Sequence, residues 1–90
     1  MAQKIAKSLV AAKLAACINI IPKVISIYRW EGKVECETET QLFIKTRQEC
    51  FANLSLTIKE LHPYTTVEII ALDIAQGNQD YLNWITESLK

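Results

Sequence analysis

A long β-hairpin is written into residues 17–46, which read CINIIPKVISIYRWEGKVECETETQLFIKT. Two arms rich in β-branched and aromatic residues, the types that fit a pleated and half-buried surface, flank the pair Glu31 and Gly32. The glycine supplies the positive φ that a tight two-residue turn requires. Pro22 interrupts the first arm and has no backbone N–H to donate, so a bend or bulge is predicted there.

The predicted ribbon is longer than the body that carries it. Each arm has about 14 residues and therefore spans ~45 Å. A compact globule of 90 residues has a radius of gyration of about 12 Å and a diameter of roughly 30 Å. One end of the ribbon must project, and it carries the apolar and aromatic residues Ile25, Ile27, Tyr28, Trp30 and Val34. Such residues on a long strand edge indicate a surface covered by a partner, most simply another copy of the chain.

Composition places the chain among small single-domain proteins. Its 90 residues, half of them apolar, make one domain over residues 1–90 with a small core that oligomerisation would enlarge. Ten basic and ten acidic residues leave no net charge, which argues against a nucleic-acid or anionic-membrane partner. No apolar run reaches membrane-spanning length, so no direct membrane insertion is expected. The three cysteines are widely spaced and form no CxxC pair, which suits free thiols in a reducing cytoplasm.

Two helices are predicted around the hairpin. Residues 2–16 have the apolar periodicity of an amphipathic helix. Thr46 and Glu49 have the spacing of a capping box at the start of the second helix. That helix should end at His62, because the residue before Pro63 is pushed out of the helical region. Its predicted buried stripe consists of Cys50, Phe51, Leu54, Ile58 and Leu61.

The C-terminal third predicts a strand and a last helix. Residues 66–75, TVEIIALDIA, are almost continuously apolar, which is typical of a central strand covered on both faces. Asn78 is a candidate N-cap, and Asp80 suits the positive end of the helix dipole. The inward face of this helix is predicted to hold Tyr81, Leu82, Ile85 and Leu89.

The predicted element order is α, β, β, α, β, α. One strand placed ahead of it would give βαββαβ plus a C-terminal helix, the ferredoxin-like fold of the α+β class. The first strand of that arrangement, which lies in the middle of the sheet, is absent from this chain. Three explanations stay open: a preceding segment lies outside the sequence, the last strand pairs differently, or another chain fills the place.

Several short motifs occur together along the chain. They are LAACIN at 14–19, SIYRWEGK at 26–33, IKT at 44–46, HPY at 62–64, EIIA at 68–71, and GN at 77–78 followed by YL at 81–82 and Trp84. The WEGK turn followed by HPY is the most specific combination. With these motifs the chain resembles the CutA family of divalent-cation tolerance proteins over essentially all of its length.

This resemblance implies several properties. It implies a ferredoxin-like fold, a tight homotrimer built through the long hairpins, and a cytoplasmic or organellar role tied to copper and other divalent ions. Animal relatives are linked instead to membrane anchoring of acetylcholinesterase, which implies a protein partner. In a bacterial relative a cysteine on the first strand takes part in copper binding, and this chain has neither. Leu61 stands where the family often has a second histidine, and Val67 stands where it has proline.

The candidate metal ligands are His62, Glu68 and Cys17. His62 is the only histidine, and an imidazole beside a carboxylate such as Glu68 can hold Cu(II) or another divalent cation. Two ligands do not complete a four-coordinate site without a thiol or a neighbouring subunit. The alternatives are a His62 ring that stabilises the helix end, a structural ion pair between Glu68 and Lys45, and a Cys17 thiol in the core.

The predicted interface consists of Ile25, Ile27, Tyr28, Trp30, Val34, Tyr64 and Trp84. Aromatic residues with polar tips are enriched at such surfaces. An enzyme is not expected, because the chain has one histidine, two glycines and no nucleophile beside a base. Two functions remain: a metal-responsive homotrimer that binds metal or a small ligand near subunit interfaces, or a trimeric scaffold for a protein partner without physiological metal binding.

Overall fold

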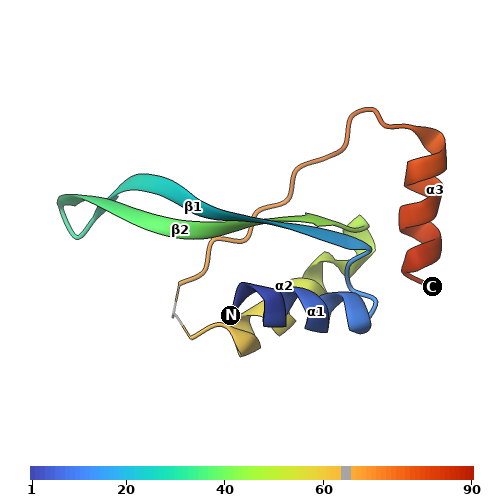
Figure 1. Cartoon of the computed structure of the whole chain (residues 1–90), viewed down its shortest axis with the longest axis horizontal. Coiled ribbons are helices and arrows are strands. Elements are labelled where there is room, and N and C mark those ends of the chain that lie inside the picture. Colours follow the sequence, from blue (N-terminus) through green and yellow to red (C-terminus); the bar gives the residue numbers. More distant parts are fainter. Residues whose placement is uncertain (64–65) are drawn as a thin grey trace.

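The computed structural model describes residues 1–63 and 66–90. Its elements are α1 (Ala2–Ala11), β1 (Cys17–Trp30), β2 (Lys33–Lys45), the 3-10 turn η1 (Gln48–Cys50), α2 (Phe51–Leu61) and α3 (Gln79–Ser88). The two strands form one long antiparallel hairpin, α1 and α2 lie together under its base, and α3 stands at the end of the molecule away from the hairpin turn (Figure 1). The predicted α+β class and the long hairpin are confirmed.

The hairpin turn has the predicted two residues. Cys17 pairs with Lys45 at the base and Trp30 pairs with Lys33 next to the turn. Glu31 has a φ of 50° and Gly32 a φ of 80°. Two consecutive residues with positive φ make the mirror-image turn whose twist matches that of the flanking strands.

A bulge interrupts the hairpin where it was predicted. The pairing shifts by one residue between Ile21 and Val24, so that Pro22 and Lys23 together stand opposite Thr40. Lys23 adopts a φ of 61°. Because an inserted residue bends its strand and increases the local twist, the bulge separates the hairpin into a base over the helices and a projecting half.

The molecule is elongated, as the ribbon length predicted. Its extents are 45 × 28 × 21 Å and its radius of gyration is 14.6 Å, larger than the value of about 12 Å that a compact chain of this length would have. Figure 1 shows the cause, because half of the hairpin extends beyond the helices.

The core is small and lies between the two helices and the base of the hairpin. Its buried cluster consists of Ile5, Leu9, Ala15, Leu54 and Ile58, with Leu14, Ile18, Ile44, Val67 and Ile69 packed around it. Leu9 is completely buried. The helical stripes predicted from the sequence supply most of these residues, since apolar residues three or four apart share one helix face.

The first helix ends earlier than predicted. It was expected to run to residue 16 but ends at Ala11, because Lys13 adopts the left-handed conformation with a φ of 60°. The Leu14 N–H then donates to the Leu9 carbonyl at 3.0 Å, and the Lys13 N–H donates to the Val10 carbonyl at 3.1 Å. This pair of bonds is a Schellman C-cap, which usually contains glycine; here a lysine occupies the position.

The predicted capping box is wrong. The Thr46 hydroxyl donates to the Leu14 carbonyl at 2.7 Å and so joins the end of β2 to the α1–β1 connection. Glu49 forms an ion pair with Arg47, with 2.9 Å between Oε2 and Nε. With Thr46 used in a tertiary contact, the chain enters α2 through η1 without a side-chain cap.

The last helix begins as predicted but presents a different face. The Asn78 side-chain oxygen accepts a hydrogen bond from the Asp80 N–H at 2.9 Å, which confirms the N-cap. Ile85 is buried and Leu82 is half-buried. Tyr81 was expected to point inward, but it is 43% exposed.

The predicted central strand over residues 66–75 is wrong. Among the described residues the sheet has only β1 and β2, and residues 66–75 run as an extended segment without a strand partner. Leu72 is 86% exposed and Ile70 is 71% exposed, so the segment is not covered on both faces. A strand exists only by backbone pairing with a neighbouring edge, and in the ferredoxin-like order that neighbour is the strand this chain lacks.

Candidate functional site

The projecting half of the hairpin has an apolar face. Residues that pair across the strands share a face of the ribbon, and Ile27 pairs with Cys36 while Arg29 pairs with Val34. Ile27 and Val34 are each 70% exposed, and Ile25 on the same face is 69% exposed. The apolar face of the ribbon (Ile25, Ile27, Val34 and Cys36) therefore lies uncovered by the rest of the described chain.

The opposite face of the ribbon combines aromatic rings with carboxylates. Tyr28 pairs with Glu35, and Glu37 lies next to them on the same face. Partial burial raises the pKa of the Tyr28 hydroxyl above its ordinary value; the carboxylates of Glu37, Glu39 and Glu35 raise it further, because negative charges disfavour a phenolate. The Tyr28 hydroxyl stays protonated at neutral pH and is a hydrogen-bond donor to Glu37.

The base of the hairpin brings Cys17 against α3. Cys17 is half-buried, and its sulfur forms a hydrogen-bonding contact with the Tyr81 hydroxyl. Partial burial raises the pKa of Tyr81, and the contact with Cys17 raises it further. Tyr81 stacks on Trp84 with 5.6 Å between ring centroids and an interplanar angle of 25°. This cluster was not predicted from the sequence, since the register between α3 and β1 leaves no local signal.

Two further contacts hold α3 at this end of the molecule. Arg47 Nη1 donates to the Thr86 hydroxyl at 3.3 Å. Lys13 Nζ donates to the carbonyl of Lys90. Trp84, a predicted interface residue, is 47% exposed beside these contacts. The indole therefore offers surface to a partner.

The candidate ligands His62 and Glu68 lie on the other side of the helical layer. His62 is the C-cap of α2, with φ −94° and ψ 134°, which confirms the predicted helix end. Its ring is half-buried, whereas Glu68 is exposed in the extended segment. The alternative pair of Glu68 with Lys45 is not among the ion pairs formed in the described part of the chain.

A metal site is not assembled within one copy. In residues 1–63 and 66–90 no three side chains of His, Cys, Asp or Glu gather closely enough to hold an ion. Cys17 opens β1 near α3, whereas His62 follows α2 at the opposite end of the helical layer (Figure 1). The predicted set of His62, Glu68 and Cys17 is thus spread over the chain. Tyr64, the remaining predicted interface residue, lies outside the described residues.

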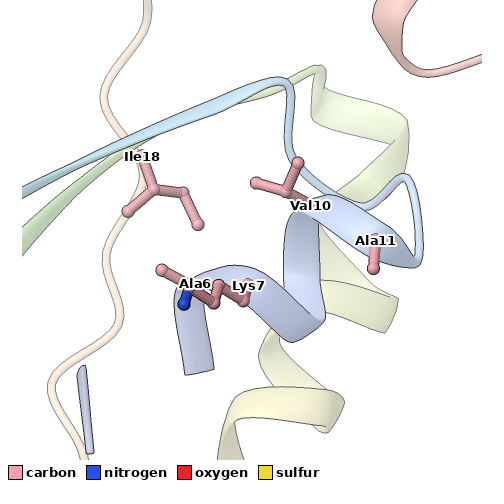
Figure 2. A pocket seen from close by; sticks show the side chains of 5 residues that line it. All are labelled: Ala6, Lys7, Val10, Ala11 and Ile18. Atoms are coloured by element: carbon pink, nitrogen blue, oxygen red, sulfur yellow. The ribbon is translucent and has the colours of Figure 1, made fainter. Parts of the chain in front are cut away.

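A shallow apolar hollow lies between α1 and β1. It has a volume of about 410 Å³ and is lined by Ala6, Lys7, Val10, Ala11 and Ile18. Figure 2 shows the side chains of α1 on one side of this hollow and Ile18 on the other. Its only titratable lining group is one lysine, so it is a packing surface without ligands for an ion.

Comparison with known proteins identifies the family. The family model described as CutA1 divalent ion tolerance protein matches residues 1–88. The chain belongs to the CutA1 family. The CutA1 resemblance carried by the sequence motifs is thereby confirmed.

Relatives from distant organisms support this membership. The divalent-cation tolerance protein CutA of Thermus thermophilus is 50% identical over 88 residues, covering 98% of this chain and 85% of the relative. The CutA homolog of Xenopus laevis is 48% identical over 94% of this chain, and the match spans 56% of that protein. This chain thus spans about half the length of the animal relative. A plant relative from Arabidopsis thaliana is named as chloroplastic.

Solved CutA1 structures share the fold. The CutA structure from Archaeoglobus fulgidus superimposes with a TM-score of 0.94 at 45% identity, covering 99% of this chain and 86% of that one. The structure from Thermus thermophilus gives a TM-score of 0.93 at 50% identity, covering 97% and 84%. These matches support the ferredoxin-like CutA1 architecture of the chain. Within the described residues no helix has both the length and the apolar character needed to cross a membrane.

Proposed function

We propose that the chain is a homotrimeric CutA1 protein that binds Cu(II) or another divalent cation near its subunit interfaces and serves divalent-cation tolerance. The apolar face of the ribbon is the observation that carries the assembly, because a strand pair with side chains about 70% exposed is stable in water only when a partner covers it. The family membership supports the role in cation tolerance. The protein acts by binding, not by catalysis, and its three free cysteines suit the cytoplasm or a reducing organelle.

The proposed ligands are His62 and Glu68 of one copy. Imidazole nitrogen and carboxylate oxygen suit a borderline ion such as Cu(II). A third ligand has to come from a neighbouring copy, because the described residues of one chain bring no three such side chains together. The thiol of Cys17 is the proposed third donor, since it lies at the other end of the helical layer of its own chain.

A titration of Cu(II) into the purified protein, followed by calorimetry, tests the metal site. His62→Ala is expected to weaken Cu(II) binding at least about tenfold, the loss that follows even from mutating an outer-shell partner of a metal ligand. Glu60→Ala removes an exposed carboxylate of α2 close in sequence to His62 and is the matched control, with unchanged affinity. Equal affinities of the natural protein and His62→Ala would remove His62 from the site.

A scaffold without physiological metal binding is the second candidate. The rings of Tyr28 and Trp30 beside a row of glutamates favour it, because aromatic residues are enriched at protein interfaces. In this case the trimer presents clefts to a protein partner. A trimer in sedimentation together with no saturable Cu(II) binding would select this function over the first.

A further inference from the structure

Residues 66–75 have the form of a strand without its partner. Their backbone is extended, yet none of their N–H or C=O groups forms a hydrogen bond with a described residue. The segment lies apart from both strands for most of its length (Figure 1). Backbone groups left unpaired against apolar surroundings cost about 1–3 kcal/mol each when water is excluded from them.

The segment is nevertheless held flat on the molecule. Val67 and Ile69 are half-buried and pack against the core cluster, while Glu68 between them is exposed. This alternation is that of a β-strand, in which successive side chains point to opposite faces. In that geometry the backbone N–H and C=O groups point sideways, toward the places that neighbouring strands would take.

The exposed part of the segment is strongly apolar. Ile70, Leu72 and Ile74 are 71%, 86% and 56% exposed. Natural sheets protect an open edge with lysine, proline or a bulge, and residues 66–75 contain neither lysine nor proline. The edge is therefore built for pairing.

We infer that residues 66–75 accept an added β-strand from another polypeptide, an extended segment with apolar side chains at every second position and basic residues at its ends. Only an extended backbone offers donors and acceptors at the spacing of an unpaired strand edge. The basic ends follow from charge, because the segment carries Glu68 and Asp73 and no cationic side chain. This inference does not depend on the metal site, and it concerns a surface other than the apolar face of the ribbon.

The probe is the peptide acetyl-Lys-Val-Thr-Val-Thr-Val-Lys-amide, and the readout is hydrogen–deuterium exchange of the amides in residues 66–75. We expect the peptide to slow exchange of these amides at least tenfold, with saturation. The same peptide methylated on its backbone nitrogens keeps every side chain but lacks the donors, and it should give no protection. At low salt Asp73→Asn should weaken binding two- to fivefold, whereas Glu31→Gln at the far turn of the hairpin should leave it unchanged.

Three results would overturn the inference. The peptide gives no protection at millimolar concentration, the methylated peptide protects as well as the parent, or the amides are already protected in the protein alone. The last result would mean that a second copy covers the segment. Sedimentation of the same sample reports the proposed trimer separately, so a failure of strand addition and a failure of assembly remain distinguishable.

Discussion

Leu9 is the best buried large side chain of the described residues, at the point where α1 meets α2. Leu9→Ala should lower the free energy of unfolding by about 2–5 kcal/mol, because truncation removes buried apolar surface and leaves a cavity. Against a total stability of about 5–15 kcal/mol for an ordinary domain, this loss is large. Urea denaturation at fixed protein concentration measures it, since assembly makes stability concentration-dependent.

Leu56→Ala is the matched control for this prediction. Leu56 lies on α2 as well but is 58% exposed, so the same truncation should change the unfolding free energy by no more than about 0.5 kcal/mol. Equal losses in the two variants would contradict the placement of the core.

At the scale of single residues, the wrong predictions share a cause. A capping box was predicted from the spacing of Thr46 and Glu49, but the Thr46 hydroxyl bonds the Leu14 carbonyl, which is distant in sequence. The end of α1 depends on Lys13 in the left-handed conformation, which any non-glycine residue adopts only at a cost. Both choices are decided by tertiary contacts that local sequence does not contain. Asn78, whose cap bond spans two residues, was predicted correctly.

At the scale of elements, the hairpin turn offers a test with opposite signs. Glu31 has a φ of 50°, a conformation that asparagine tolerates better than glutamate. Glu31→Asn should therefore raise the free energy of unfolding by roughly 0.5–1 kcal/mol, part of the 1–2 kcal/mol that the left-handed conformation costs an ordinary residue. Gly32→Ala should lower it by about 1 kcal/mol for the same reason.

Thermal and urea unfolding of the two variants measure these changes. Glu31→Gln changes the charge without relieving the backbone and is the control for Glu31→Asn. A gain in Glu31→Gln equal to that in Glu31→Asn would assign the effect to charge and not to the turn conformation.

The hairpin was predictable because its signals are local. The turn pair, Pro22 and the alternation of side chains each act within a few residues. Residues 66–75 carry equally strong strand preferences, but a strand also needs an edge to pair with, and no described residue supplies one. The apolar pattern therefore reports the need for a partner and not the presence of one. The metal set depends in the same way on contacts between copies, which the sequence of one chain does not place.

At the scale of the whole molecule, the shape links the small core to assembly. The chain extends 45 Å in one direction but only 21 Å in the shortest, so a large part of its surface is the ribbon. Small domains bury a low fraction of their surface and are correspondingly marginal. An assembly that covers the ribbon would supply the apolar burial that the core of one copy lacks.

The double variant Ile25→Lys and Ile27→Lys tests this assembly, because it places two charges on the apolar face of the ribbon and leaves the core cluster untouched. In sedimentation the natural protein should run at about three times the 10.2 kDa chain mass, and the variant at a lower mass. Leu56→Lys puts one charge on an exposed leucine of α2 away from the ribbon and should keep the mass of the natural protein. A stable interface needs roughly 1,000 Å² of buried surface, so two desolvated lysines within it cost several kcal/mol. A natural protein that sediments as a single chain at micromolar concentration would show that water alone is enough to keep the ribbon in solution, and the trimer would have to be abandoned.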